Sequence, residues 1–273
     1  MTDRPELSDD VDMKRRNDAQ TLNGWDRDKV TEDAFLGGRL RLFQPRNGFR
    51  AGLDSVMLAA AVPAQNGETI ADLGSGVGTA SLCLMARVPG LNLTVIEIDQ
   101  GLVELANANF RANKIDGTFH AIAGDALALE REIPRNAFDH VLTNPPFLDS
   151  ASATTGPDQG KARAIAQAAQ STDLWYKTAL ALLKPKGTLT LIQRADMLSE
   201  ILQRLEPGTG DIEVLPLYAS PTAPAIRVII RARKGRRGPL RILPPLILHQ
   251  ADGSFTSAAE AVLRNGCALI TSP

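Results

Sequence analysis

From residue 69 onward, short apolar segments with the pattern of β-strands alternate with longer segments with the pattern of helices. Strands that are apolar throughout and are separated by helices form a parallel sheet with helices on both faces. Such sheets bind ligands beyond the carboxyl ends of their strands, where the strand order reverses. The predicted strands are residues 69–73, 93–99, 118–125, 137–144, 188–193, 211–218 and 225–233, and the predicted helices between them are residues 79–88, 101–113, 162–183 and 197–205.

The last two predicted strands break this alternation. Only the turn "ASPTAP" (219–224) joins them, and it is too short for a helical crossover. These two strands should therefore pair antiparallel. The predicted fold is α/β, with a seven-stranded, mostly parallel sheet that contains one antiparallel strand and carries helices on both faces.

The region before residue 65 has a different pattern. Residues 34–44 alternate as a hairpin that turns at two glycines, and residues 52–62 have the pattern of a short helix. The first thirty residues are polar and charged, which predicts a mobile tail over 1–30.

The C-terminal region carries one further helix pattern, in "TSAAEAVLRNG" (256–266). Ser257 followed by Glu260 has the spacing of a capping box, and Gly266 is placed to end the helix. This helix is predicted to have a structural role, packed on the core.

Charge and cysteine content exclude several kinds of site. The 30 Lys and Arg residues nearly balance the 31 Asp and Glu residues, so a site for a polyanion must come from local clustering. Cys83, Cys267 and the three histidines are scattered, so we expect neither a metal site nor a disulfide, which suits a reducing cytoplasm. No signal peptide and no apolar run of about 18 residues is present, so no membrane span is expected.

A glycine cluster, "DLGSGVG" (72–78), follows the first predicted strand and opens the first helix. Glycines at this point let the backbone bend sharply and approach a ligand beneath the amides of a helix N-terminus. Thr79 stands where a dinucleotide-binding pattern needs its third glycine. Asp72, directly before the glycines, also argues against a polyanion and favours a cationic amino-acid group.

Two more carboxylates follow the next two strands. Glu97 ends the second strand, where a carboxylate can bind both hydroxyls of a ribose. Asp125 ends the third, where it can receive an adenine amino group. Each acid alone could be an ordinary turn or strand-end residue, but their order and spacing together describe a site for S-adenosylmethionine.

At this point residues 65–233 resemble the Rossmann-like class I S-adenosylmethionine-dependent methyltransferases. "DLGSGVG" is similar to their first motif, "VIEID" to their second and "GDA" to their third. The resemblance implies a cofactor site formed by Asp72, Gly74, Gly76, Gly78, Glu97, Asp125, Ala126 and Asn144.

The fourth strand runs directly into "NPPF" (144–147). The exocyclic amine of a base is a poor nucleophile, and two acceptors that hold its hydrogens favour the form that can attack a methyl group. The side-chain oxygen of Asn144 and the carbonyl of Pro145 are the predicted acceptors, held in place because Pro145-Pro146 restricts the backbone. Phe147 is predicted to stack on the substrate. The alternative is a strand-ending turn with Phe147 in the core.

"NPPF" is similar to the "(D/N/S)-P-P-(Y/F)" motif of enzymes that methylate planar amino groups: adenine N6, cytosine N4 or a glutamine amide. The N-terminal flank narrows the choice, because it resembles that of the bacterial tRNA1(Val) adenine-N6 methyltransferases, over residues 31 to about 250. The matching residues are Gln44, Arg50, Gly52, Asp54 and 58–62. By this resemblance Arg50 and Asp54 close over the methionine end of the cofactor.

Two local clusters of basic residues agree with an RNA substrate. They comprise Arg39, Arg41, Arg46 and Arg50 near the hairpin, and Arg227, Arg231, Arg233, Lys234, Arg236, Arg237 and Arg241 near the last strand. Arg233 and Arg236, with Phe147, are the predicted substrate-binding residues. The expected partner is tRNA, bound by a monomer or weak homodimer in the cytoplasm.

The predicted organisation is a tail (1–30), a hairpin and helix that cap the cofactor site (31–64), a methyltransferase catalytic domain (65–233) and a C-terminal extension packed on the core (234–273). Alternative functions remain open. A protein-glutamine N5 methyltransferase would carry a helical N-terminal domain, and a DNA adenine methyltransferase would need a target-recognition region. Guanine-N2 methylation of rRNA uses a related motif, and a binding protein without turnover would not need an intact "NPPF".

Overall fold

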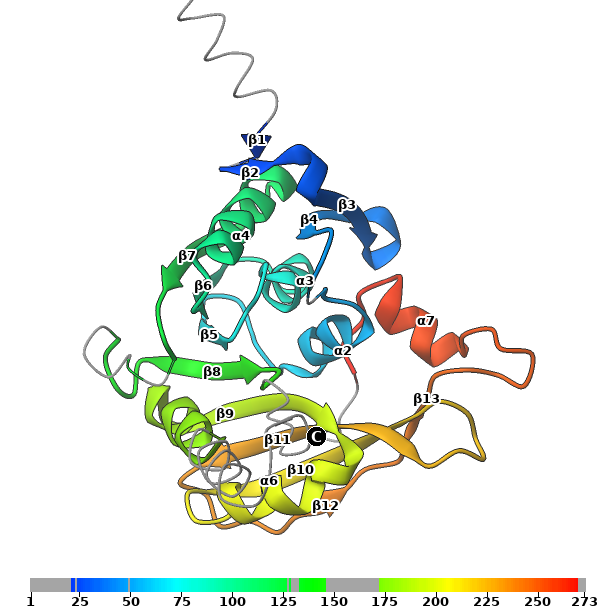
Figure 1. The fold of residues 1–273 in the computed structure, drawn as a ribbon. Helices are drawn as coiled ribbons and strands as arrows, with labels where there is room; N and C mark the ends of the chain where they lie inside the picture. The colour runs from blue at the N-terminus through cyan, green and yellow to red at the C-terminus, as the bar shows by residue number, and fades with distance from the viewer. Residues whose placement is uncertain are drawn as a thin grey trace, which may run out of the picture.

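The computed structural model describes residues 21–22, 24–48, 50–126, 128, 133–145 and 172–269, and its centre is one twisted sheet (Figure 1). Seven strands form the body of this sheet, as the sequence predicts. In chain order they are β5 (Thr69–Leu73), β6 (Leu91–Glu97), β7 (Gly117–Ala123), β8 (Phe138–Thr143), β9 (Leu183–Arg194), β10 (Thr209–Tyr218) and β11 (Ala225–Lys234).

The strand order reverses at the centre of the sheet. The order is β7-β6-β5-β8-β9-β11-β10, so the chain starts at β5, moves outward to β7 and returns to the other side of β5. β5 and β8 are parallel, with Leu73 opposite Thr143, so their carboxyl ends lie side by side. Ligands bind at such a reversal, because the loops that follow the two strands diverge there.

The predicted reversed strand is confirmed: β11 pairs antiparallel with both β10 and β9. The sheet is wider than the predicted seven strands. Two short strands, β12 (Arg241–Ile242) and β13 (Leu246–Ile247), pair parallel with β10, which brings the described sheet to nine strands. Segments of two residues carry too little pattern to be recognised in the sequence.

Helices cover both faces of the sheet, over two separate clusters of buried apolar side chains. One face carries α2 (Leu53–Ala61), α3 (Thr79–Arg87), α4 (Gln100–Asn113) and α7 (Ser257–Leu263), and the other carries α6 (Leu198–Leu205) and the helix 172–182. The remainder of the predicted helix 162–183 lies outside the described residues. In the parts of the chain that the structure describes, no helix is long and apolar enough to cross a membrane.

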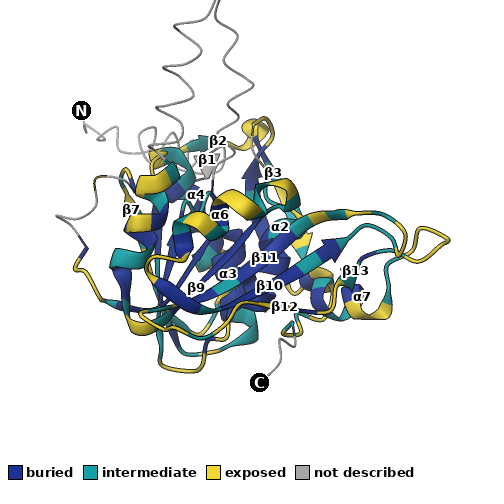
Figure 2. Ribbon diagram, turned by 90° about the horizontal axis from the view of Figure 1, so that it is seen from below, coloured by how far each residue is buried: buried dark blue, intermediate teal, exposed yellow. Residues whose placement is uncertain are grey.

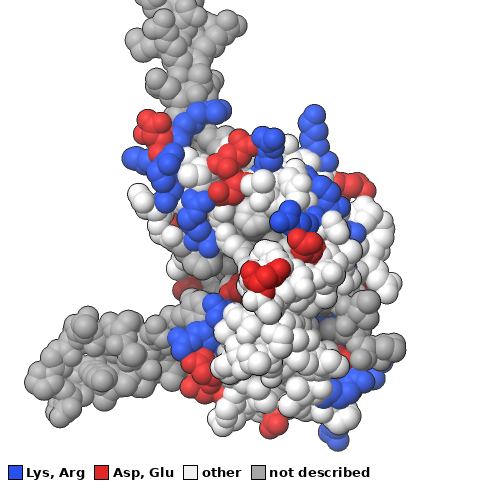
Figure 3. All heavy atoms as spheres, turned by 90° about the vertical axis from the view of Figure 1, so that its right-hand side faces the viewer, with Lys and Arg blue, Asp and Glu red and all other residues white. Residues whose placement is uncertain are grey.

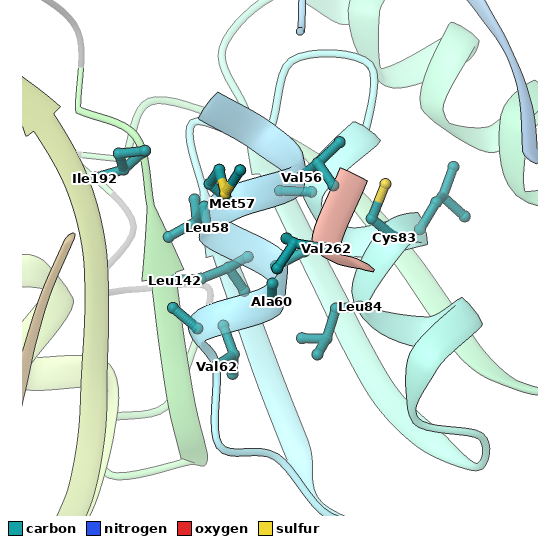
Figure 4. Close-up of a cluster of buried hydrophobic side chains, with 14 of the residues drawn as sticks. Val56, Met57, Leu58, Ala60, Val62, Cys83, Leu84, Leu142, Ile192 and Val262 are labelled. Atoms are coloured by element: carbon teal, nitrogen blue, oxygen red, sulfur yellow. The ribbon is translucent and has the colours of Figure 1, made fainter. Parts of the chain in front are cut away.

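Helix α2 lies at the centre of the first cluster (Figure 4). Leu58 and Met57 point between the helix and the strands β8 and β9, and Val262 of α7 approaches from the opposite side. The central strands β5 and β8 are buried along most of their length, whereas the edge strand β7 is partly exposed, as are the outer sides of the helices (Figure 2). Packing on both sides fixes the start of α2, which borders the functional edge of the sheet.

The predicted N-terminal hairpin is present as β3 (Val30–Phe35) and β4 (Leu40–Pro45), joined by the short 3-10 turn η2 (Leu36–Gly38). Two asparagines of α4 bind its backbone. Asn109 accepts from the amide of Phe43 (2.6 Å) and donates to the carbonyls of Phe43 (3.0 Å) and Val77 (3.1 Å). Asn113 repeats the pattern one turn later on Arg41. The hairpin is thus joined to α4 and, through Val77, to the glycine loop.

The predicted tail ends earlier than residue 30. Residues 21–26 form a small pair of strands, β1 (Thr21–Leu22) and β2 (Trp25–Asp26), followed by the 3-10 turn η1 (Arg27–Lys29). The indole Nε1 of Trp25 donates to the carbonyl of Gly101, which ties this segment to α4. Residues 24–30 therefore belong to the folded structure, while residues 1–20 lie outside the described residues.

The cap of the last helix also differs from the prediction. Thr256 is the N-cap of α7, because its Oγ1 accepts from the amide of Ala259 (3.1 Å), so the capping residue lies one position before Ser257. The predicted end is confirmed, since Gly266 has a left-handed φ of 62° and its amide donates to the carbonyl of Val262. A following bond from Leu269 to Ala60 joins the C-terminal segment to α2.

We predict that Asn109→Ala lowers the free energy of unfolding by about 3 kcal/mol, because Asn109 is fully buried and its loss leaves buried backbone groups of the hairpin and glycine loop without partners. Asn113→Ala removes the same kind of bond at a more exposed position and should cost about 1 kcal/mol or less. Urea unfolding of both variants checks this, and equal losses would contradict the role given to Asn109.

Candidate active site

A cavity opens where β5 and β8 end, as the strand alternation predicts. It contains about 510 Å³ of empty space, part of it open to solvent. Four segments form its walls: the start of α2 with Ala51 and Ser55, the region from Asp72 through the glycine loop into α3, Leu102 of α4, and Asn144 after β8. The cavity therefore brings together the first predicted cofactor motif and the predicted catalytic asparagine.

The glycine loop that follows β5 has left-handed backbone angles. Glycine is present at each of its positions for a different physical reason. Gly74 has φ 71°, and a Cβ at this position would lie 2.9 Å from the ring of Trp175. Gly76 has φ 57° with open space where a Cβ would stand, and its amide donates to Oε2 of Glu97 (2.8 Å). Gly74 is thus required by packing, whereas Gly76 leaves room for a ligand. Gly78, the N-cap of α3, packs against Ala106 of α4.

Asp72 is a buried carboxyl group at the floor of the cavity, with only 2% of its surface exposed. Burial raises its pKa to about 7, helped by the negative charge of Glu97 and opposed by the hydrogen bond from Ser81 Oγ (2.6 Å). A carboxylate that is costly to ionise in the free protein becomes favourable when a cation pairs with it. Asp72 is therefore suited to an ammonium group bound in the cavity.

Glu97 ends β6 beside the glycine loop, at the predicted place. Its Oε1 accepts from the amide of Asp99 (3.2 Å), so both carboxylate oxygens are held by backbone amides and keep acceptor capacity for hydroxyl groups. The next residue, Ile98, is 70% exposed. An exposed apolar side chain beside an acceptor for hydroxyls suits a nucleoside, whose base is apolar on its faces.

The third cofactor motif lies beside the second. The amide of Gly124 donates to the carbonyl of Glu97 (2.9 Å), which places Asp125 and Ala126 next to the end of β6. Asp125 is exposed and Ala126 is buried. Their predicted role toward adenine stays a prediction, because the cavity walls at this side do not include them.

Asn144 carries the most informative feature of the site. Its side-chain oxygen Oδ1 is buried and has no hydrogen-bond partner among the described residues. A buried acceptor without a donor costs about 1–3 kcal/mol, which a ligand can recover by donating to it. Pro145 is buried as well, and its carbonyl accepts from Nε2 of Gln193 (3.3 Å). The predicted catalytic residues Pro146 and Phe147, the second of which is also predicted to bind the substrate, lie outside the described residues.

Asn144 is also held from the strand side. Thr143 Oγ1 donates to the carbonyl of Leu73 (2.8 Å) and accepts from Nε1 of Trp175 (3.1 Å). The same tryptophan packs on Gly74, so one ring joins the ends of β5 and β8 to the helix 172–182. These bonds fix the backbone on which both Asp72 and Asn144 depend.

Trp175 and Gln193 were not predicted from the sequence, although each left a signal. Trp175 is one of two tryptophans in the chain. Gln193 is a polar residue at the carboxyl end of an otherwise apolar strand, as Asn144 and Glu97 are. Unlike the carboxylates and the "NPPF" asparagine, a glutamine at a strand end matches no cofactor or catalytic motif, so the sequence alone does not mark Gln193 as a site residue.

Arg50 and Asp54 do not line the cavity; they form ion pairs that fix the position of the segment that does. The Arg50 guanidinium binds Asp33 (2.5 Å) and Thr31 Oγ1 (2.7 Å) in the hairpin, and Asp54 pairs with Arg227 of β11 (2.8 Å). Buried Gln44 accepts from the amide of Ala51 (2.8 Å). The neighbours of Arg50 and Asp54, which are Ala51 and Ser55, form the wall. The two predicted residues therefore act on the cavity through these neighbours.

The prediction that Arg233 and Arg236 bind the substrate does not fit the structure. β11 runs antiparallel, so Arg227 lies opposite Arg194 at the functional edge while Arg233 lies opposite Thr188, roughly 20 Å away along the strand. Arg236 lies further along and pairs with Asp211 (3.0 Å). Both residues belong to the opposite edge of the sheet from Asn144.

Comparison with known proteins shows the family to which the chain belongs. Residues 50–214 match the family described as methyltransferase small domain. The chain is 31% identical over 175 residues to a tRNA1(Val) (adenine(37)-N6)-methyltransferase of Porphyromonas gingivalis, which covers 62% of this chain and 68% of that protein. A protein of the same description from Proteus mirabilis is 24% identical over 219 residues, which cover 78% of this chain and 84% of the relative.

A solved structure is similar over most of the chain. The crystal structure of a predicted O-methyltransferase from Agrobacterium tumefaciens matches with a TM-score of 0.67 and 26% identity, and covers 80% of this chain and 98% of that one. The fold assembled around the cavity is thus that of a methyltransferase.

The raised pKa of Asp72 predicts a pH dependence for S-adenosylmethionine binding. Below about pH 7 the carboxyl group is protonated and cannot pair with the ammonium, so affinity should rise with pH by up to about tenfold per unit and level off above about pH 7. Isothermal titration calorimetry over this range checks it. Asp72→Asn should bind weakly with no such slope, whereas the exposed Asp116→Asn should keep the slope. A wild-type slope in Asp72→Asn would refute the assignment.

Proposed function

Because the chain belongs to the methyltransferase small domain family, we propose that it transfers the methyl group of S-adenosylmethionine to the N6 amine of an adenine in tRNA. The observation that carries this proposal is the buried Oδ1 of Asn144, which has no partner among the described residues and lies beside Pro145 at the wall of a cavity floored by Asp72. The relatives named tRNA1(Val) (adenine(37)-N6)-methyltransferases support adenine and tRNA as the substrate.

The cavity, together with the end of β6 beside it, fits S-adenosylmethionine. We assign the ammonium to the buried carboxylate of Asp72, the ribose hydroxyls to Glu97 and the face of the adenine to the exposed Ile98. The open space at Gly76 lets the backbone approach this ligand closely. When bound there, S-adenosylmethionine supplies an electrophilic methyl group.

Asn144 and Pro145 act on the amine that receives the methyl group. An NH2 group has two hydrogens, and the Asn144 side-chain oxygen and the Pro145 carbonyl can each accept one. These two hydrogen bonds turn the nitrogen lone pair toward the cavity. Holding the amine in this orientation is the main way in which the two acceptors accelerate methyl transfer. The nitrogen gains the methyl group and gives up one proton to water, and S-adenosylhomocysteine is the second product. The proton needs no dedicated base, since the methylated amine is acidic.

The two acceptors favour an amine over a hydroxyl substrate, although one structural relative is described as a predicted O-methyltransferase. A hydroxyl carries one hydrogen, so a second buried acceptor would face an oxygen lone pair. The N4 amine of cytosine, a glutamine amide and the N2 amine of guanine are other NH2 groups that this pair could hold. The tRNA-adenine relatives favour adenine over these three.

We assign contact with the RNA to the hairpin side of the cavity and no longer to Arg233 and Arg236. The exposed Arg27, Lys29 and Arg46 lie on the folded N-terminal segment, and blue Lys and Arg side chains gather there over β1–β4, interspersed with acids (Figure 3). This segment adjoins Ala51 at the cavity wall. A tRNA substrate also implies a cytoplasmic protein, and action as a monomer or weak homodimer remains part of the proposal.

We keep the predicted division of the chain as part of this proposal: a capping segment (31–64), a catalytic domain (65–233) and a C-terminal extension (234–273). The buried cluster on the α2 face takes side chains from all three, including Leu42, Leu84 and Val262. The three segments therefore share one core, and none of them is expected to fold alone.

Asn144→Ala is expected to abolish methyl transfer to tRNA while S-adenosylmethionine affinity stays within about tenfold, because the side chain lost is an acceptor for the amine. Transfer of labelled methyl groups to bulk tRNA, with the product nucleoside identified by mass spectrometry, tests the proposal. N6-methyladenosine supports it. Methylglutamine in protein, N2-methylguanosine in rRNA, or full activity of the variant would each refute it.

Charge reversal after the N-terminal hairpin and at the far edge of the central sheet should separate the two candidate RNA surfaces. Arg46→Glu should weaken tRNA binding several-fold and reduce its salt dependence, because a cation near phosphates is lost. Arg236→Glu, a matched change on the opposite edge, should leave binding within about twofold. Filter binding at several salt concentrations measures the tRNA affinity of both variants. A larger loss in Arg236→Glu than in Arg46→Glu would show that the RNA binds near the last strand instead.

A further inference from the structure

Gln193 is a buried residue at the carboxyl end of β9, next to Asn144 and Pro145, with 5% of its surface exposed. Its amide has a defined orientation. Oε1 accepts from the backbone amide of Arg194 (2.9 Å), so Nε2 is turned toward Pro145, whose carbonyl it reaches at 3.3 Å. Both ends of the Gln193 amide are therefore engaged: Oε1 satisfies the last residue of β9, and Nε2 reaches out of the strand to Pro145.

The hydrogen bond from Gln193 to Pro145 fixes the one part of the acceptor pair that the proline ring leaves free, which is the direction of the Pro145 carbonyl. The proline ring fixes φ of Pro145, but the direction of its carbonyl depends on ψ, which the ring does not fix. A hydrogen bond from a donor on a neighbouring strand fixes that direction. A carbonyl oxygen has two lone pairs, so the Pro145 oxygen can accept from Gln193 and from a substrate amine at once.

Asn144 is then held on both sides. Thr143, before it, is bound to Leu73 and Trp175, and Pro145, after it, is bound to Gln193. The side-chain oxygen of Asn144 is the acceptor between them that no described residue satisfies. The backbone on both sides of Asn144 is therefore held in place, while the side-chain oxygen of Asn144 stays available. This arrangement is expected at a site that orients a group of the substrate.

We propose that Gln193 is a positioning residue for methyl transfer, which aims the Pro145 carbonyl at the second hydrogen of the substrate amine. This inference rests on the proposed function, because the carbonyl needs aiming only if it accepts from an NH2 group. Gln193 does not contact the cofactor cavity and acts through Pro145 alone. A purely structural role, in which the amide only satisfies the end of β9, makes different predictions.

Two variants of Gln193 separate these roles. Gln193→Met keeps the length of the side chain and removes the donor, so kcat should fall about tenfold while KM for tRNA and S-adenosylmethionine affinity stay within about twofold. Gln193→Glu places a carboxylate against the Pro145 carbonyl at neutral pH, so its loss of kcat should be larger. The matched control is Thr190→Val on the same strand, whose buried hydroxyl has no partner to lose. It should keep the wild-type kcat.

The pH profile of Gln193→Glu gives a readout that a structural role would not move. Once protonated, the introduced carboxyl can donate to the Pro145 carbonyl as the amide does, and burial raises its pKa toward the working range. Its activity, relative to wild type at the same pH, should therefore recover several-fold as the pH falls from about 8 to about 6. Because the ratio is taken at each pH, the titration of Asp72 cancels.

The outcomes separate the inference from the function on which it rests. Wild-type kcat in Gln193→Met, or no recovery of Gln193→Glu at low pH, overturns the positioning role while N6-methyladenosine formed by the wild type leaves the function standing. Reduced kcat with unchanged KM and a recovering pH ratio supports it. If the wild type forms no N6-methyladenosine in tRNA, the proposed function fails and the positioning role fails with it.

Discussion

The parallel pairing of β5 with β8 is the constraint on which the rest of the structure depends. It sets Leu73 opposite Thr143, and the Thr143 hydroxyl then bonds directly to the Leu73 carbonyl across the pair. Asp72, with its buried carboxyl group, is the residue before the end of β5, and Asn144, whose amide oxygen no described residue satisfies, directly follows β8. Without this register the two groups would face different parts of the surface, and no cavity would join them.

The buried Asp72 carboxyl group and the buried Asn144 oxygen both lower the stability of the folded protein. Groups that destabilise the fold in this way indicate a binding site. Burial holds the pKa of Asp72 near 7, and the amide oxygen of Asn144 lies buried without a described donor. Neither arrangement stabilises the fold, so the packing of α2 and α3 on the strands must offset both. Each group becomes favourable only when a ligand supplies what is missing: a cation at Asp72 and a hydrogen-bond donor at Asn144.

The sequence predicted the sheet, its reversed strand and the cofactor loop, because apolar periodicity and glycine spacing report local backbone structure. The positions of charged side chains were harder to predict, as Arg233 and Arg236 show. The sequence showed that these basic residues cluster, but the edge of the sheet on which they lie depends on the direction of β11. Because β11 is antiparallel to β9, its last residues lie at the edge opposite the cavity. Gln193 and Trp175 act across strands and helices that are distant in the chain, so no local pattern marked their contacts. The cap at Thr256 differed by one position, because Ser257 offers the same hydroxyl.

The contact between Gly74 and Trp175 has a consequence for how this chain can vary. Any side chain at Gly74 would push into the indole, and any smaller ring at Trp175 would open space above the loop and release the Thr143 hydroxyl. The two positions thus form a single steric unit, although they lie far apart in the chain. Gly74 also has a left-handed φ of 71°, which strains any other residue, so a smaller ring at Trp175 would not by itself allow a side chain in this turn.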